Sequence, residues 1–381
     1  MIADSKAVSG TSPHTNPMLS ALSFSDSNLD LQIERLKQSR LGVFLDAAGL
    51  VVSPAEIAFH YRNSIGMGRK GAYGCTKGFK KIDIGQEEVL KKILENYQLT
   101  LKLREAEIVG TRQKLDELRL YSYDVPLVSI RKDSRLVGQK ILHITDIHLM
   151  HKHHKKSIRL VQALLDALEK REDLQDVKVI VFTGDFIDKS EKDLLPEALP
   201  ILKRISQDRQ VLYVLGNHDF HDGEFVVHNY LKQAGFTDIT NQVLTCDMNG
   251  EKVNFVGMDD PYEGTPIYPD SKSLDQGLPT IALVHHIDAL NRKHDPFLDL
   301  VVYGHMHGIE VNLGEASLNY MKNKGFLYNH NETNTGWKAL TARTLAYGSP
   351  GMSTHSPIRF NSPKPGITLL TLKSSSVLSS I

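Results

Sequence analysis

Five short segments rich in aspartate and histidine follow apolar runs along the C-terminal two-thirds of the chain. In order they are Asp146-Ile147-His148, Gly184-Asp185-Phe186-Ile187-Asp188, Gly216-Asn217-His218-Asp219, His285-His286 and Gly304-His305-Met306-His307. Their carboxylate, amide and imidazole groups could hold two hard-to-borderline divalent cations. Taken singly, an Asp-x-His or a Gly-Asn-His-Asp segment is more often a turn or a helix cap than a metal site. The ordered series of five therefore carries the prediction of a metal-dependent reaction.

Apolar runs with the character of buried strands position these segments. The runs are 141–145, 177–183, 211–215, 253–258, 280–284 and 298–303, and helices are predicted at about 156–170, 191–207, 223–234 and 287–293. Continuous apolar strands that alternate with helices are typical of a sheet buried on both faces. Polar residues just past the strand ends collect at one edge of such a sheet, so ligands that are distant in the sequence can converge.

The order and spacing of the five segments resemble the calcineurin-like metallophosphoesterase superfamily, whose pattern is D-x-H, G-D-x-x-D, G-N-H-D/E, H and G-H-x-H. The resemblance covers about 140 to 372. It implies an α/β fold, an α+β sandwich with two central mixed β-sheets flanked by helices, preceded here by a helical N-terminal extension. It also implies an enzyme that hydrolyses phosphoric esters.

The resemblance assigns seven side chains to two divalent metal ions. The first ion would be bound by Asp146, His148, Asp185 and His307, and the second by Asp185, Asn217, His285 and His305. Asp185 would bridge the ions, because only a carboxylate offers two anionic oxygens. A water between the ions would lose a proton near neutral pH and attack phosphorus in line, as a metal-activated hydroxide. Manganese is the first expectation, and iron, zinc or other borderline ions also suit these ligands.

His218 and Asp188 match the catalytic pair of the family. His218 would stabilise the phosphoryl oxygens or protonate the leaving group, and Asp188 would fix the tautomer of that imidazole. Because His285 directly follows its strand, it is preferred over His286 as a metal ligand. The residues predicted to bind substrate are Asn217, His218, His286 and Arg359. Asp219 is expected to support the site from behind the ligands.

The sequence restricts the type of reaction more closely than it restricts the substrate. Residues 257–260 and 348–371 resemble a bacterial branch of the superfamily that includes membrane-associated phosphoesterases and the UDP-diacylglucosamine pyrophosphohydrolases of lipid A precursor synthesis. The expected reaction is hydrolysis of a phosphodiester or pyrophosphate bond in a small molecule with a lipid or nucleotide portion. A phosphomonoesterase, a protein phosphatase or a non-catalytic scaffold that keeps the fold are the alternatives.

Composition restricts the partners and the compartment. The chain has 45 lysine and arginine residues against 45 aspartate and glutamate residues, and a single tryptophan, so a nucleic acid is not an expected partner. Only two cysteines occur, Cys75 and Cys246, which suits a reducing cytoplasm. No apolar stretch approaches the roughly 20 residues of a membrane span, although contact with a membrane surface stays open. The oligomeric state is not readable from these patterns.

Three regions are predicted along the chain. Residues 1–28 have the composition of a disordered tail, 29–135 form a mainly helical extension, and 136–381 form the metallophosphoesterase domain. Within the extension, leucine and isoleucine recur at seven-residue spacing between 86 and 120, which predicts a long amphipathic helix. Two irregular insertions, about 259–279 and 314–342, are candidates for loops that face the substrate.

Overall fold

The computed structural model describes residues 101–115, 118–150, 154–188, 192–221, 223–267, 274–275, 277–290, 297–307, 335–341, 343–353 and 364–376. The predicted tail at 1–28, most of the predicted extension and Arg359 lie outside these ranges. One compact unit comprises the described residues of 107–338 and 343–375, and it carries all the predicted ligands. The second unit is described only at 101–106, 339–341 and 376.

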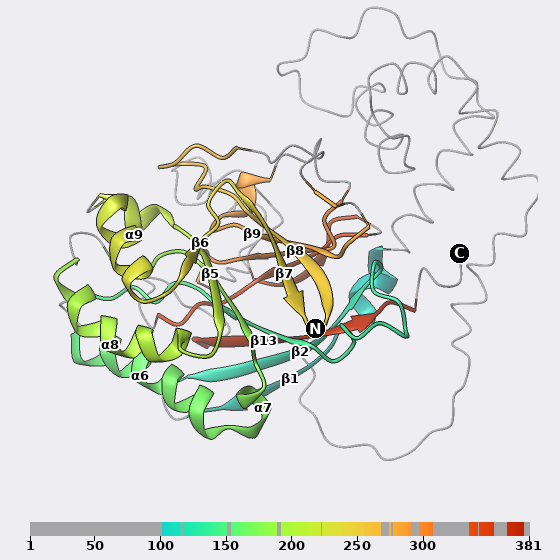
Figure 1. Cartoon of the computed structure of the whole chain (residues 1–381), viewed down its shortest axis with the longest axis horizontal. Helices are drawn as coiled ribbons and strands as arrows, with labels where there is room; N and C mark the ends of the chain where they lie inside the picture. The colour runs from blue at the N-terminus through green and yellow to red at the C-terminus, as the bar shows by residue number, and fades with distance from the viewer. Residues whose placement is uncertain are drawn as a thin grey trace, which may run out of the picture. The chain divides into compact units, whose positions relative to one another are not determined.

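Two mixed sheets form the centre of the first unit (Figure 1). The first sheet has the order β1 (Val109–Lys114), β2 (Arg119–Leu127), β13 (Gly366–Ser374), β3 (Lys140–Ile144), β4 (Val179–Thr183), β5 (Gln210–Val214) and β6 (Thr237–Asp238). The second has the order β11 (Gly336–Ala339), β12 (Leu345–Gly348), β10 (Leu300–Tyr303), β9 (Thr280–Leu283), β8 (Glu251–Gly257) and β7 (Val243–Met248). The prediction of two mixed sheets is confirmed for the described residues.

Parallel pairing dominates the middle of each sheet. Strands β3, β4, β5 and β6 run parallel to one another, and so do β8, β9, β10 and β12. Antiparallel neighbours stand towards the edges, where β1 pairs with β2 and β7 with β8, and β13 also runs antiparallel to β3. Parallel neighbours end at the same edge of a sheet, so the residues that follow β3, β4 and β5 must lie close together.

Helices cover one face of the first sheet. They are α6 (His154–Lys170), α7 (Glu172–Gln175), α8 (Leu195–Ser206) and α9 (Glu224–Gln233), drawn in green and yellow in Figure 1. Leu164 of α6, Leu202 of α8 and Leu231 of α9 join Phe182 of β4 in one buried apolar cluster. The helices predicted at about 156–170, 191–207 and 223–234 correspond to α6, α8 and α9, which pack apolar residues against the sheet. No helix within the described ranges is long and apolar enough to cross a membrane.

The other face of the first sheet meets the second sheet. The Tyr347 ring of β12 lies 5.3 Å from the Tyr123 ring of β2, and Thr368 of β13 donates a hydrogen bond to the Tyr347 hydroxyl at 3.2 Å. A sheet buried between helices and a second sheet has to be apolar on both faces, as β3 and β4 are.

The prediction of a long helix over 86–120 is wrong beyond Ala106. Residues 101–106 are helical, but β1 and β2 follow within the next 21 residues. Gly110 and Thr111 are poor helix formers, and β2 gains nine paired residues against β13. The sheet of the first unit therefore begins before residue 136, where the predicted metallophosphoesterase domain starts. The helix predicted at 287–293 is also shorter than expected, because only Ile287–Ala289 form a single 3-10 turn before the described stretch ends at Leu290.

Candidate metal centre

The strand ends of both sheets deliver the predicted ligands to one place. Asp146 follows β3, Asp185 follows β4, Asn217 follows β5, His285 follows β9 and His305 follows β10. The two sheets are joined here directly, because the backbone N–H of His305 donates to both carboxylate oxygens of Asp146 at 3.1 Å. All seven predicted metal ligands lie within this group.

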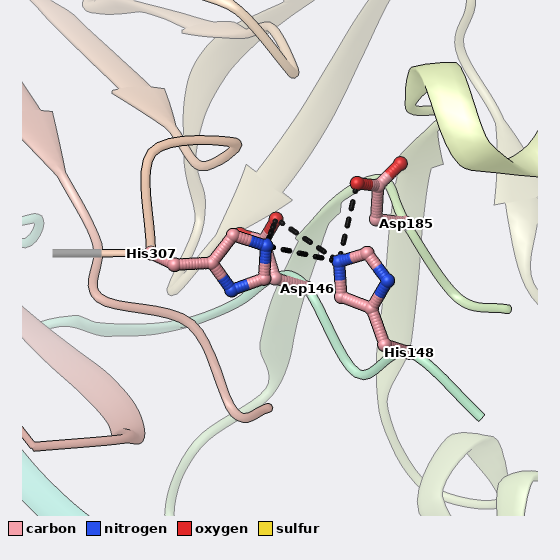
Figure 2. Close-up of side chains that lie close together, drawn as sticks. All are labelled: Asp146, His148, Asp185 and His307. Atoms are coloured by element: carbon pink, nitrogen blue, oxygen red, sulfur yellow. Dashed lines mark hydrogen bonds and ion pairs between the residues drawn. The ribbon is translucent and has the colours of Figure 1, made fainter. Parts of the chain in front are cut away.

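The first cluster contains two aspartates and two histidines (Figure 2). The Nε2 atoms of His148 and His307 lie 3.0 Å apart, and His307 Nε2 lies 3.4 Å from Asp146 Oδ1. His148 Nε2 is also 3.3 Å from Asp185 Oδ2. Figure 2 shows His148 between the Asp185 carboxylate and the Asp146–His307 pair. Ligand atoms of all four side chains lie within 4.8 Å of one another.

The second cluster shares Asp185 with the first. Asp185 Oδ2 lies 3.3 Å from His285 Nε2, the same distance as from His148 Nε2 on the other side. Asn217 Oδ1 lies 3.1 Å from His285 Nε2 and 3.0 Å from His305 Nδ1. One carboxylate oxygen therefore faces an imidazole nitrogen of each cluster.

Backbone strain is concentrated at the same residues. Seven non-glycine residues have a positive φ among the described residues, and five of them are predicted ligands: Asp146, His148, Asp185, His305 and His307, with φ between 46° and 69°. Each such conformation costs about 1–3 kcal/mol and persists where surrounding structure enforces it. The concentration of strain at these residues is typical of a functional site.

The amino-acid sequence is similar to those of known phosphoesterases. The family model described as calcineurin-like phosphoesterase matches residues 139–308. An uncharacterized metallophosphoesterase of Bacillus subtilis, YkuE, is 31% identical over 242 residues, which cover 62% of this chain and 80% of YkuE. The chain belongs to the calcineurin-like metallophosphoesterases. A second uncharacterized metallophosphoesterase, from Aquifex aeolicus, is 24% identical over 278 residues, covering 70% of this chain and 97% of its own.

The donor set of this metallophosphoesterase fits divalent cations. Asp146 and Asp185 are 0% and 1% exposed, and burying two carboxylates side by side is costly unless positive charge compensates them. The Nδ1 of His285 donates to the carbonyl of Thr183 at 2.7 Å, so its Nε2 lone pair is directed at the cluster. This is the hydrogen-bonding arrangement of a metal-binding histidine in a mixed nitrogen and oxygen site.

Electrostatics in the metal-free phosphoesterase support the same conclusion. Burial lowers the pKa of His148 and of His285, but the adjacent aspartates outweigh burial and raise each pKa to about 10. Burial, with the charges of His285 and His286, lowers the pKa of His305 to about 3. Despite burial, the surrounding histidines hold the pKa of Asp146 and of Asp185 below the usual range. Protons on His148 and His285 thus occupy the place that cations would take.

His218 and Asp188 lie beside the ligands as a pair. His218 Nδ1 donates to Asp188 Oδ1 at 2.7 Å, and both side chains are about a quarter exposed, at 26% and 29%. The His218 ring lies 4.7 Å from the His148 ring, nearly perpendicular to it. The backbone N–H of His218 also donates to Asp185 Oδ1 at 3.0 Å. The phosphoesterase therefore presents this imidazole to solvent at the edge of the metal clusters.

Asp219 fastens the turns that carry the ligands. Its buried carboxylate accepts four backbone N–H groups, from Asp185 at 2.9 Å, Phe186 at 2.9 Å, Ile187 at 3.2 Å and Gly216 at 3.0 Å. Burial and the nearby Asp185 carboxylate raise the pKa of Asp219, and the N–H donors act in the opposite direction. The expected support by Asp219 thus takes the form of backbone hydrogen bonds that join the ends of β4 and β5.

Two glycines allow the turns to approach so closely. A methyl group on Gly216 would overlap Asp185 Oδ1 and lie 2.7 Å from His285 Nδ1. A methyl group on Gly304 would overlap Thr145 Oγ1 and Asp146 Oδ2. Glycine at these positions is therefore required by the packing of ligands against backbone.

Some residues around the phosphoesterase centre were not predicted from the sequence. His143 is fully buried in β3, and its Nε2 lies 2.8 Å from Thr183 Oγ1, beneath the carbonyl that orients His285. A lone histidine inside an apolar strand was the available indication. Tyr262 lies beside His286 and His305, and its only advance indication was its position in the insertion at 259–279.

Proposed function

We propose that this chain hydrolyses a phosphodiester or pyrophosphate bond in a small molecule, with two divalent cations as cofactors. One ion would be held by Asp146, His148, Asp185 and His307, and the other by Asp185, Asn217, His285 and His305. The observation that carries the proposal is the position of Asp185 Oδ2, 3.3 Å from an imidazole nitrogen of each cluster. When bound, the two ions would lower the pKa of a water molecule and offset charge on the phosphoryl oxygens.

Manganese is the first cofactor to test, followed by iron and zinc. The ligands are carboxylate, amide oxygen and imidazole, a mixture that several borderline divalent ions accept. Thiolates are absent from both clusters, and the described cysteine, Cys246, is buried in β7. Selection among the ions therefore follows geometry and availability.

His218 and Asp188 are proposed to act on the substrate. Asp188 accepts the Nδ1–H of His218, so the ring is held and its Nε2 can donate to a phosphoryl or leaving-group oxygen. An imidazole held in this orientation is suited to donate a proton to a departing oxygen. The leaving group is an alkoxide when a diester is cleaved and a phosphate when a pyrophosphate is cleaved. Either group departs more readily when it receives a proton.

Asn217 and His286 are proposed to bind substrate as well. Asn217 is partly exposed next to His218, and its amide nitrogen can donate to a phosphoryl oxygen while its oxygen faces the second cluster. His286 accepts the backbone N–H of Asp288 at Nδ1, which leaves the proton of its neutral ring on Nε2. Arg359 remains part of the proposal as a substrate-binding residue. A lipid or nucleotide portion on the substrate fits the resemblance to the bacterial branch.

A substrate panel with several metals tests the proposal. The metal-stripped protein is supplied with Mn²⁺, Fe²⁺ or Zn²⁺ and offered an aryl monoester, an aryl diester, a cyclic nucleotide, a phosphopeptide and a lipid-linked nucleotide diphosphate. We expect metal-dependent turnover of the diester or the pyrophosphate. A preference for the aryl monoester or the phosphopeptide would favour a phosphomonoesterase or protein phosphatase, and no turnover at all would favour a scaffold.

Two aspartate variants complete the design. Asp185→Asn removes the shared anionic oxygen and should abolish turnover. Asp166→Asn makes the same change on the exposed side of α6, where the carboxylate pairs with Lys170, and should leave turnover unchanged. Full activity in Asp185→Asn or in a metal-free preparation would overturn the proposal.

A further inference from the structure

An aromatic side chain stands exposed beside the second ligand cluster. Tyr262 lies in the loop at 259–267 that follows β8, and the residue is 43% exposed. Its ring is nearly parallel to that of His305, at 24° and 6.5 Å between centroids, and edge-on to His286 at 5.1 Å. An aromatic ring that is exposed beside a metal site can stack against part of a bound ligand.

The loop holds this ring in a fixed orientation. The Tyr262 hydroxyl donates to Asp288 Oδ2 at 2.6 Å, and its backbone N–H donates to the buried Asp260 at 2.9 Å. Asn241 closes the base of the loop, because its Oδ1 accepts the N–H of both Asp259 and Ile267. The exposure of Tyr262 is therefore built into an ordered loop, and little conformational entropy remains to be lost when a ligand covers it.

The charges around the ring restrict what it can bind. Residues 259–267 contain Asp259, Asp260 and Glu263 and no lysine or arginine, and Asp288 stands at the hydroxyl. Asp259 and Asp260 already accept backbone N–H groups of the loop, and the acidic character of this segment disfavours a second phosphate or an anionic headgroup beside the ring. An uncharged planar ring, such as a nitrogen heterocycle, suits an aromatic face in these acidic surroundings.

We propose that Tyr262 is the stacking platform for a planar nitrogen heterocycle, such as a nucleobase, on the organic part of the substrate. The inference rests on the proposed function, because His305 marks where the reacting phosphate would lie. It deepens that function by assigning a nucleotide portion, in place of an acyl chain, to the group nearest the second cluster. Stacking on one aromatic face tolerates several bases, so the platform favours nucleotides over simple esters without selecting one base.

Binding of hydrolysis-resistant phosphonates tests the platform without requiring turnover. The full chain with Mn²⁺ is titrated by calorimetry with three probes: the 5′-methylenephosphonate of adenosine, the corresponding ribose phosphonate without the base, and octylphosphonate. We expect the adenosine analogue to bind about tenfold more tightly than the ribose analogue, as a stacked base does. Tyr262→Leu should remove that advantage, while Tyr262→Phe, which keeps the ring and loses the hydroxyl, should keep most of it.

The possible outcomes separate this inference from the proposed function. Equal binding of the adenosine and ribose probes by the wild-type protein overturns the platform, whatever the variants do. Tighter binding of octylphosphonate, or a base advantage that survives Tyr262→Leu, overturns it as well. If Tyr262→Leu weakened the binding of all three probes equally, the ring would contribute only to the shape of the site, and stacking on a base would be refuted. A base advantage in a protein that hydrolyses no ester would leave the platform standing and refute the proposed function alone.

Discussion

Replacing Asp219 by asparagine tests whether backbone hydrogen bonds hold the metal centre together. In the wild-type protein, Oδ1 accepts the N–H groups of Phe186 and Ile187, and Oδ2 accepts those of Asp185 and Gly216. The amide that replaces this carboxylate offers one oxygen and one NH2 group, and the NH2 group would face two donors. Whichever way the amide is oriented, two buried N–H groups lose their acceptor.

The cost follows from counting those two donors. An unsatisfied buried polar group costs about 1–3 kcal/mol, so Asp219→Asn should lower the free energy of unfolding by about 2–6 kcal/mol. At least one of the affected N–H groups belongs to the turn after β4, which carries Asp185 at a φ of 55°. Relaxation of that turn would move the shared carboxylate, so metal affinity should fall together with stability.

Denaturant unfolding and manganese titration measure both effects on the same variant. Asp247→Asn is the matched control, because Asp247 is exposed and accepts a single N–H, from Gly250 at 2.8 Å. The control should change the free energy of unfolding by about 0.5 kcal/mol or less. A loss below about 1 kcal/mol in Asp219→Asn, with unchanged manganese affinity, would refute the role given to these four bonds.

Four further predictions have definite expected results. Because the pKa values of His148 and His285 are raised to about 10 in the metal-free protein, metal binding at about pH 7 should release about two protons, measured by calorimetry in buffers of different ionisation enthalpy. The same raised pKa values stabilise the metal-free fold fully below about pH 6.5, and this stabilisation is lost as the pH rises towards 10. The melting temperature of the metal-free protein should therefore fall between these pH values. A rise would contradict the pairing of His148 and His285 with the aspartates. Asp188→Asn should leave metal content unchanged and lower kcat by about 100-fold through His218, and an unaltered kcat would remove the pair from catalysis. Gly304→Ala should cost about 1–3 kcal/mol of stability by overpacking and weaken binding of the first ion, which metal titration with thermal unfolding would detect; wild-type values for both would contradict the close approach.

The strands next to the ligands could be predicted because both of their faces are buried. Strand β4 is buried at every position, which gives a continuous apolar run, and β3, β5, β9 and β10 read in the same way. Polar residues that end such runs stand out in a sequence. The order of these polar segments along the chain then identified the candidate ligands that the strand ends bring together.

The first two strands could not be predicted, for a physical reason. Strand β1 is exposed along its whole length, so its sequence carries no apolar pattern, and β2 mixes buried and half-buried positions. Leu118 is buried beside these strands, and its spacing from earlier leucines coincides with a helical period. Pairing of β2 with β13, more than 200 residues later, decides the structure there, and local sequence does not encode it.

The residues that surround the candidate ligands could not be predicted from the sequence either. The four bonds of Asp219 and the fixed orientation of Tyr262 arise from turns that have no periodic pattern. Sequence spacing indicates which side chains could bind metal, but the conformation of the loop that carries Tyr262 is set by contacts such as those of Asn241 and Asp288. This is why the candidate metal ligands could be predicted and the position of the Tyr262 ring could not.

Anomalous diffraction from crystals grown with manganese tests the central claim most directly. Two ions sharing one carboxylate should give two peaks, the first among Asp146, His148, Asp185 and His307, and the second among Asp185, Asn217, His285 and His305. Both peaks should disappear or weaken in Asp185→Asn, whereas Asp166→Asn should keep them. A single peak, or a second peak that Asp185 does not contact, would contradict the dinuclear account.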